Sequence, residues 1–362
     1  IRTMFLVLVL SVVAFTVYAN IAKTEQPMIQ PESGTSVSAG TISAGGESLD
    51  MEDAAGLEAS NDTNDEESGA ERNYVKENVT IKISALGDVA LGQDHRFKYM
   101  DSFDYYFDKK IEGDYSYFFS NVKDILSGDD LTIANLETTL SNEETQAEKY
   151  DYGNNYWFRG KPEYANILKA GSVEVANLAN NHTYDYGQKG YDDTRKALEE
   201  AGIEYFGYDK VLHIEIKGIK VGIAGFNQLG NVEQGLNMTE FKKEVQETIE
   251  SARDECDLVI ANFHWGKEYK YEPEKLQKEL AYLAIDSGAD LVIGHHPHVL
   301  QPVEEYKGRY IAYSLGNFCY GGVKHPKDYD TAIYQQSFVF DSDNVLQRVD
   351  EPVIIPCSVS SQ

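Results

Sequence analysis

The chain has 362 residues, of which 42% are hydrophobic, and a formal net charge of −28 at pH 7. This length is enough for a large buried core. The negative charge argues against nucleic acid as a partner and against electrostatic docking on anionic lipid. The three cysteines, Cys256, Cys319 and Cys357, contain no C-x-x-C pair, so a thiolate zinc site is not expected, and one disulfide stays arithmetically open.

The N-terminal region is apolar and then acidic. Residues 4–19 are an almost unbroken hydrophobic run after Arg2. Residues 1–22 therefore suit either a cleaved signal peptide or a single membrane anchor. Residues 23–78 are rich in acidic, Ser and Gly residues and predict a disordered linker. We favour the anchor because a long spacer suits a tethered domain. Both alternatives predict export: an anchored domain outside the cell membrane, or secretion.

The folded part is expected at residues 79–356, followed by a short tail at 357–362. Strand patterns alternate with helix patterns along it, which favours an α/β fold. Hairpin-like stretches at 211–225 and 302–313 make mixed sheets the expectation. Strands are predicted near 79–88, 130–137, 172–182, 203–206, 211–216, 219–225, 257–264, 290–293 and 309–318. Helices are predicted at 162–169, 187–201, 239–254 and 273–286, with helical spacing also within 99–127.

Metal-ligating side chains gather where these strands end. They are Asp88, Glu137, the pair Asn181-His182, His264 and the pair His296/His298. Carboxylate, amide and imidazole together are ligand types for Mn, Fe or Zn with room for water. A carboxylate can bridge two ions about 3.5–4 Å apart, a pair that polarises a phosphoryl oxygen. Each residue alone also fits a turn or core role, but their shared position at strand ends indicates one site.

Six ordered motifs resemble a known family. They are GDVALG at 87–92, NLETTLS at 135–141, ANNHTYDYG at 179–187, HWGKEY at 264–269, GHHPHVLQ at 294–301 and SLGNF at 314–318. In this order they are similar to the bacterial capsule-synthesis CapA family, the poly-γ-glutamate synthesis group, over about residues 79–356. The resemblance implies a calcineurin-like metallophosphoesterase fold: a four-layer sandwich of two mixed β-sheets flanked by helices.

The resemblance also implies residue roles. Asp88, Glu137, Asn181, His264, His296 and His298 match metal-ligand positions, with Glu137 as the bridge, for one or two divalent ions (Mn, Fe or Zn). His182 matches a residue that protonates the leaving group, and Asp185 would orient it or, as an equal alternative, cap the following helix. Asn317 is expected to line the pocket, Glu268 and Tyr269 to face the pocket or solvent, and His295 has no counterpart.

The sequence also departs from the phosphoesterase pattern. Ala90 stands where the first motif usually has His, and Leu136-Glu137 replace Gly-Asp. One metal position therefore lacks an imidazole. His95 is a candidate replacement.

Three readings of the function follow. The first is a metal-dependent phosphoesterase-like hydrolase at the cell surface, acting on a phosphoester or on an anionic polymer such as poly-γ-glutamate. The alternative is a non-catalytic, membrane-anchored accessory subunit of a polymer synthase or export complex, which Ala90 favours. A metal-free binding module leaves the strand-end ligands unexplained.

Overall fold

The computed structural model describes residues 78–149, 155–208, 210–229, 237–322 and 325–359. The expected anchor or signal peptide, and the expected linker apart from Asn78, lie outside these residues. The description below concerns the compact unit within Glu71–Gln362.

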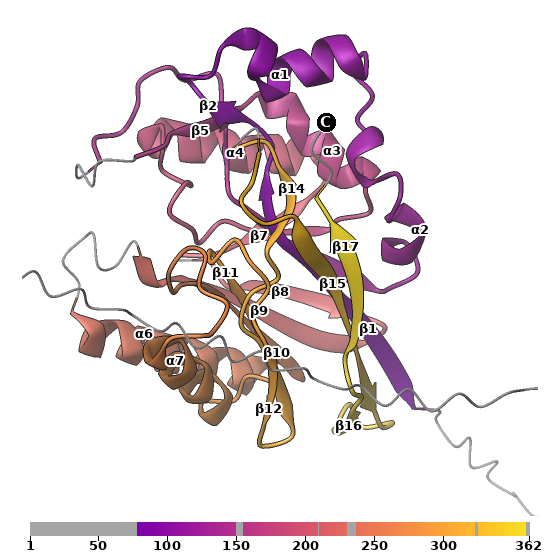
Figure 1. Ribbon diagram of the computed structural model, residues 1–362. Coiled ribbons are helices and arrows are strands. Elements are labelled where there is room, and N and C mark those ends of the chain that lie inside the picture. Colours follow the sequence, from indigo (N-terminus) through magenta and orange to yellow (C-terminus); the bar gives the residue numbers. More distant parts are fainter. Residues whose placement is uncertain (1–77, 150–154, 209, 230–236, 323–324, 360–362) are drawn as a thin grey trace, which may run out of the picture. The chain divides into compact units, whose positions relative to one another are not determined.

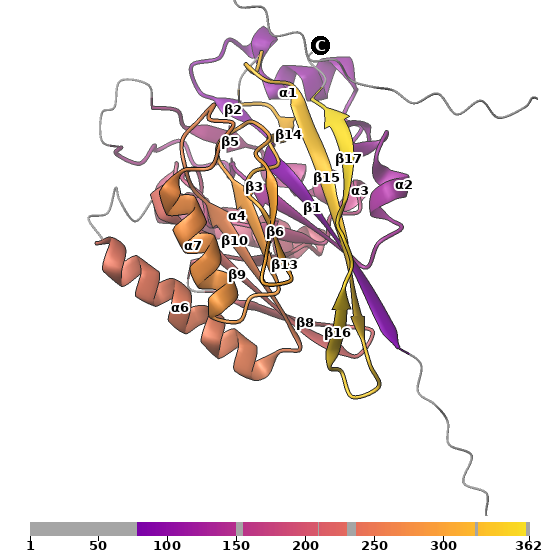
Figure 2. The same cartoon turned by 60° about the horizontal axis from the view of Figure 1, so that its bottom comes forward.

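Within the described residues, two large mixed sheets face each other (Figures 1 and 2). The first sheet has the order β16-β15-β1-β3-β6-β7, with β14 on β1 and β17 on β15. Its strands are β1 (Val79–Ala90), β3 (Leu131–Leu136), β6 (Val175–Asn177), β7 (Glu204–Phe206), β14 (Asn317–Tyr320), β15 (Asp330–Phe340), β16 (Leu346–Val349) and β17 (Val353–Ser358). Strands β1, β3, β6, β7 and β14 run parallel, and β15 runs antiparallel to β1.

The second sheet has the order β12-β13-β11-β10-β9-β8. Its strands are β8 (Leu212–Ile216), β9 (Ile219–Asn227), β10 (Leu258–His264), β11 (Leu291–His295), β12 (Val303–Tyr306) and β13 (Arg309–Ala312). The two expected hairpins are present as the antiparallel pairs β8–β9 and β12–β13. A small third sheet joins β2 (Gln93–Asp94), β5 (Phe158–Gly160) and β4 (Thr139–Leu140).

Helices cover the outer faces of both sheets. The first sheet packs on α3 (Ala165–Ala170) and α4 (Gly187–Ala201), and the second on α6 (Met238–Glu255) and α7 (Lys275–Asp286). Figure 2 shows α6 and α7 side by side along the second sheet. Residues 99–127 form short turns rather than one helix: η1 (Tyr99–Asp101), α1 (Phe103–Tyr105), η2 (Tyr106–Lys110), η3 (Tyr117–Phe119) and α2 (Lys123–Leu126). The turn η4 (Pro162–Tyr164) leads into α3.

Three apolar clusters confirm the layered arrangement. One lies between the sheets and joins Ile81 and Ile133 of the first sheet to Ile223 and Ile260 of the second. The other two lie between each sheet and its helices. The order helix, sheet, sheet, helix is the four-layer arrangement expected from the sequence. Each Å² of apolar surface that these faces remove from water stabilises the fold by about 25 cal/mol, so their burial is the main source of stability.

Local signals explain the helix ends. The helix α4 ends at Gly202, whose φ of 76° is left-handed and suits glycine. The helix α7 begins with a capping box between Glu274 and Gln277. All three cysteines are unpaired.

Candidate metal centre

The parallel strands of both sheets end at the same edge of the inter-sheet core. Along β3 the residues Leu131, Ile133 and Asn135 share one face, and along β10 Ile260 shares a face with His264. The face that is apolar in mid-strand therefore becomes polar at the strand ends. This change creates a buried polar layer on top of the inter-sheet core.

A bulge in β1 aims Asp88 into this layer. Ala85 pairs with Ile133 of β3, but Asp88 pairs with Asn135, so β1 uses three residues where β3 uses two. Strict alternation would put Asp88 on the opposite face from Ala85, and the extra residue returns it to the inter-sheet face. Gly87 allows this path, because a Cβ there would lie 2.1 Å from the carbonyl oxygen of Gly316.

The carboxylate of Asp88 has different partners on its two oxygens. Oδ1 accepts a hydrogen bond from Nδ2 of Asn135 at 2.8 Å. Oδ2 accepts from the backbone N–H of His296 at 3.3 Å and lies 3.1 Å from Nδ1 of His298. Asn135 also approaches Nδ1 of His264 at 3.3 Å. The residue Asn135, not singled out from the sequence, therefore links two predicted ligands.

Glu137 is the centre of the arrangement. Its side chain is 0% exposed, and neither carboxylate oxygen has a hydrogen-bond partner. Around Oε1 lie Nε2 of His264 at 3.5 Å, Nε2 of His298 at 3.8 Å and Nε2 of His182 at 3.9 Å. A buried carboxylate without partners is costly, and a cation would remove that cost.

Two ligand groups share Glu137. One is Glu137, His264 and His296; the other is Asp88, Glu137 and His298; within each group the ligand atoms lie within 4.8 Å of one another. These residues fit a divalent ion, and the shared carboxylate is where the sequence predicted a bridge. Oδ1 of Asn181 lies 2.8 Å from Nε2 of His264. The structure thus gathers all six predicted ligands at one place.

The turn after β11 is held in an unusual backbone conformation. His296 and His298 have φ values of 95° and 55°, on either side of Pro297. Non-glycine residues rarely adopt positive φ, and such strain clusters at functional sites. Gly294 lets the turn start close to the neighbouring strand, since a Cβ would lie 2.1 Å from the carbonyl oxygen of Tyr313.

The electrostatics of the site favour a positive charge between the two acids. Burial, together with the charge of Asp88, raises the pKa of Glu137 well above its usual value. Burial alone would lower the pKa of His298, but the carboxylates of Glu137 and Asp88 raise it to about 10. Burial lowers the pKa of His296 to about 3 and that of His264 well below its usual value. Neutral imidazoles are the form that binds metals.

His182 is oriented by Asp185. Nδ1 of His182 lies 2.7 Å from Oδ2 of Asp185, and the ring stacks on Phe158 with centroids 4.2 Å apart. Asp185 also accepts from the backbone N–H of Phe158 and pairs with Lys149 at 2.5 Å. The helix α4 has Tyr186 as its N-cap with no side-chain cap bond. Of the two alternatives for Asp185, its contacts match orientation of His182.

Other residues named from the sequence are accounted for as follows. Asn317 contacts His298, with Oδ1 2.9 Å from Nδ1. His95 belongs to neither ligand group; its side chain is 44% exposed and bonds Gln146 at the surface, so it does not replace the imidazole missing at Ala90.

A cleft of about 530 Å³ opens onto this site. Its lining includes the site residues Asn181, His182 and His296 and the charged residues Lys149, Lys267 and Glu268. The two lysines are already paired, Lys149 with Asp185 and Lys267 with Glu274 at 2.7 Å. The protein itself thus adds little free positive charge to the cleft.

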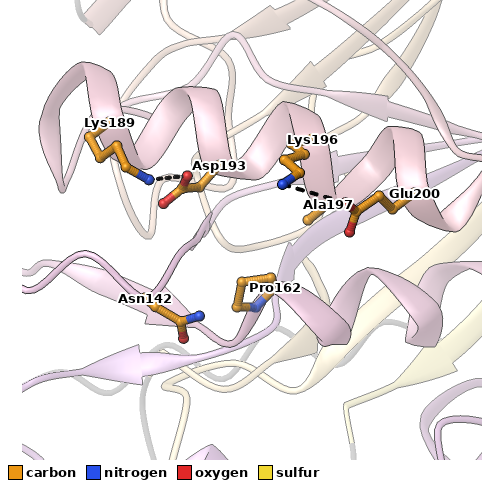
Figure 3. Close-up of a pocket in the computed structure, with 7 residues that line it drawn as sticks. All are labelled: Asn142, Pro162, Lys189, Asp193, Lys196, Ala197 and Glu200. Atoms are coloured by element: carbon orange, nitrogen blue, oxygen red, sulfur yellow. Dashed lines mark hydrogen bonds and ion pairs between the residues drawn. The ribbon is translucent and has the colours of Figure 1, made fainter.

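A smaller hollow of about 240 Å³ lies along α4 (Figure 3). Its charged residues form i,i+4 pairs on the helix, Lys189 with Asp193 and Lys196 with Glu200. Exposed pairs of this kind are ordinary features of a helix surface. This hollow contains none of the predicted ligands.

Residues 82–321 match the family model "Bacterial capsule synthesis protein PGA_cap". The chain belongs to this family. It is 32% identical over 265 residues to the capsule biosynthesis protein CapA of Bacillus anthracis, a match that covers 68% of this chain and 61% of that protein. It is 31% identical over 220 residues to the PGA biosynthesis protein CapA of Bacillus subtilis, covering 56% of each. The chain thus spans less than two thirds of these family members.

Two further similarities are weaker. A probable polyglutamine synthesis accessory protein of Mycobacterium tuberculosis is 27% identical over 212 residues, covering 52% of this chain and 55% of that protein. A solved phosphatase from Mycoplasma pneumoniae is 18% identical, with a TM-score of 0.45, covering 77% of this chain and 94% of that one. Within the described residues of this family member, no helix has the length and apolarity to cross a membrane.

Proposed function

We propose that the chain is a metal-dependent, hydrolase-like protein of capsule or poly-γ-glutamate synthesis. The observation that carries this proposal is Glu137, a fully buried carboxylate without hydrogen-bond partners that belongs to two ligand groups. A buried carboxylate without partners destabilises the fold, so packing does not explain it. A bridge between bound cations does.

The ligand set suits Mn, Fe or Zn. Asp88, Glu137 and His298 would hold one ion, and Glu137, His264 and His296 the other, with Asn181 beside His264. When bound, divalent ions supply Lewis acidity, which polarises a substrate oxygen and lowers the pKa of water.

His182 is suited to move a proton. Asp185 holds its Nδ1, so Nε2 is left facing the centre, 3.9 Å from Oε1 of Glu137. With Nδ1–H donating to Asp185, the ring carries a second proton on Nε2 in its imidazolium form and can deliver that proton to a leaving group, returning to the neutral ring. Stacking on Phe158 restricts its rotation. In this proposal the imidazolium form of His182 is the general acid, and Asp185 holds the orientation of its ring.

An anionic substrate fits the charge balance once ions are bound. The cleft lysines are neutralised by acids, so attraction for an anion has to come from the metal centre. Two divalent cations against the two carboxylates Asp88 and Glu137 leave a net positive charge. A phosphoester or a stretch of glutamate polymer meets this requirement, and the name of the Bacillus subtilis relative, a PGA biosynthesis protein, favours the polymer.

The test starts from full-length protein in mild detergent, stripped with chelator and reloaded with Mn²⁺, Fe²⁺ or Zn²⁺. Metal content is measured by mass spectrometry, and hydrolysis is assayed on a generic phosphodiester and on γ-glutamyl amides. His264→Ala should abolish activity and lower metal content. His213→Ala, at a half-exposed histidine outside the site, is the matched control and should do neither. A metal-loaded protein that is inert on the whole panel would overturn the catalytic part.

A non-catalytic accessory role is the second candidate, because Ala90 leaves one ion without the imidazole usual in phosphoesterases. The Mycobacterium tuberculosis relatives carry the word accessory in their names. This role predicts that cells carrying Asp88→Ala with His296→Ala still export polymer. Loss of export in that strain, at unchanged protein level, would favour catalysis.

We also propose that the protein is attached to the cell membrane with its folded part outside. The apolar run at 4–19 and the acidic stretch that follows support this location. External protease should then cleave the chain in intact cells, and the membrane fraction should hold it. Recovery of the protein from the growth medium would support the secreted alternative, and resistance to protease in intact cells would contradict both.

A further inference from the structure

His295 is a buried imidazole that the metal centre described above does not use. Its side chain is 1% exposed, and neither ring nitrogen has a hydrogen-bond partner. It pairs across the parallel strands with His264, and its Nδ1 lies 3.6 Å from Oδ1 of Asp88. Buried polar groups nearly always have a partner, so an unpartnered histidine against a ligand carboxylate needs an explanation.

His295 lies beside a different oxygen of Asp88 from the one that faces the ligand group. Oδ2 of Asp88 faces His298, a member of the ligand group. Oδ1 faces Asn135, at 2.8 Å, and His295. The two oxygens of Asp88 therefore have separate surroundings, one toward the ligand group and one toward the inter-sheet layer. His295 belongs to neither ligand group.

A second unpartnered side chain lies nearby. Asn262 is fully buried in β10, and both its amide nitrogen and its amide oxygen lack partners. It is two residues before His264 and pairs with Ile293, two residues before His295. Both side chains thus belong to the polar end of the inter-sheet face. This polar layer extends one level deeper than the ligands.

We propose that His295 is a positioning residue for Asp88. It donates a hydrogen bond from Nδ1 to Oδ1, and this bond fixes the carboxylate so that Oδ2 points at the ion. A shift of about half an ångström brings the 3.6 Å separation into hydrogen-bond range. The inference rests on the proposed ion binding but not on catalysis.

Contacts behind a ligand set metal affinity. Loss of such a partner typically weakens metal binding by about 10–100-fold. The side-chain amide of Asn can place an N–H near the position of Nδ1, whereas that of Gln reaches the position of Nε2. The two substitutions therefore separate a donor at Nδ1 from a general need for a polar side chain.

The experiment measures Mn²⁺ binding to the full-length chain by calorimetry after chelator treatment. His295→Gln and His295→Phe should raise the dissociation constant for Mn²⁺ about 10–100-fold. The dissociation constant of His295→Asn should stay within about threefold of the wild-type value. Unfolding temperatures in chelator check that each variant is folded. Equal weakening by Asn and Gln, or no weakening by either, overturns the proposal. If the His295→Asn variant bound one ion fewer than the wild type, His295 would be a direct metal ligand, and this result would also overturn the proposal.

A measurement on the wild type covers the case of variants that do not fold. Ring-¹⁵N spectra of the Zn²⁺-loaded protein report which nitrogen of each histidine carries the proton. The proposal requires the proton of His295 on Nδ1, and a proton on Nε2 overturns it. A wild-type chain that binds no ion would overturn both this inference and the proposed function, whereas ion binding without hydrolysis would leave this inference standing.

Discussion

Replacing Glu137 with Gln removes the charge that both ligand groups share while keeping the shape of the side chain. In chelator, the wild-type carboxyl is buried without partners, and burial raises its pKa. A neutral amide avoids the cost of a buried charge. We therefore expect the variant to be as stable as the wild type in chelator, or more stable by up to about 2 kcal/mol.

With ions the order should change. An ion present at 100 times its dissociation constant stabilises the folded wild type by about 2.7 kcal/mol per site. For a domain of this size that corresponds to an increase of very roughly 5–10 °C in unfolding temperature. Glu137→Gln should lose most of this ion-dependent increase, because both groups lose their common ligand.

The assay is thermal unfolding of full-length protein in EDTA and in Mn²⁺, together with metal analysis. The control is Glu279→Gln, an exposed glutamate of α7 paired with Lys242, which should change stability by less than about 0.5 kcal/mol in either buffer. The reasoning would be refuted if Glu137→Gln were clearly less stable than the wild type in EDTA, or if Mn²⁺ raised both unfolding temperatures equally.

Three further outcomes are expected. Asp185→Asn should lower turnover at least tenfold with metal content unchanged, because it removes the acceptor that orients His182; a loss of metal would instead show a role in binding. Asp94→Ala should destabilise the fold by about 1–3 kcal/mol, since it removes the buried acceptor of Arg96. Burial alone would raise the pKa of Asp94, but the hydrogen bonds that its carboxylate accepts outweigh burial and lower the pKa below its usual value. Its contribution to stability is therefore fully present above the pKa of the unfolded state and is lost as the pH falls through the pKa of the folded state. An effect of Asp94→Ala that persists fully in strong acid would contradict this. Gly87→Ala should give little folded protein in a solubility and circular dichroism test, because its Cβ would overlap a backbone oxygen at 2.1 Å.

Local patterns predicted most of the regular elements. The helix at 187–201 is found with those bounds, because its buried face, led by Tyr191 and Leu198, and its terminal glycine are both visible in the sequence. Strands that end in a ligand were also found, since apolar runs followed by Asp88 or His264 carry their own signal. The helical spacing of 99–127 did not translate into one helix, because its aromatic rings pack on the first sheet in separate short turns.

Features that depend on pairing between distant strands could not be predicted. The bulge that aims Asp88 exists only in relation to β3. The place of Asn135 between Asp88 and His264 needs both sheets in position. His295 looked like an extra histidine because its register with His264 is invisible in one strand alone. Strand β15 carries no motif, and its sequence, DTAIYQQSFVF, does not alternate strictly between apolar and polar residues, so it could not be predicted.

The position of β15 has a practical consequence for choosing gene fragments. Its residues pair with β1 from Val79 opposite Phe340 to Ala85 opposite Tyr334, yet the family match ends at residue 321. A clone trimmed to the matched span would leave the edge of β1 open to solvent and to other chains. Such a fragment would still match the family model in full, although it lacks β15, the strand that pairs with β1. Aggregation of the fragment in expression trials would therefore say nothing about the intact protein.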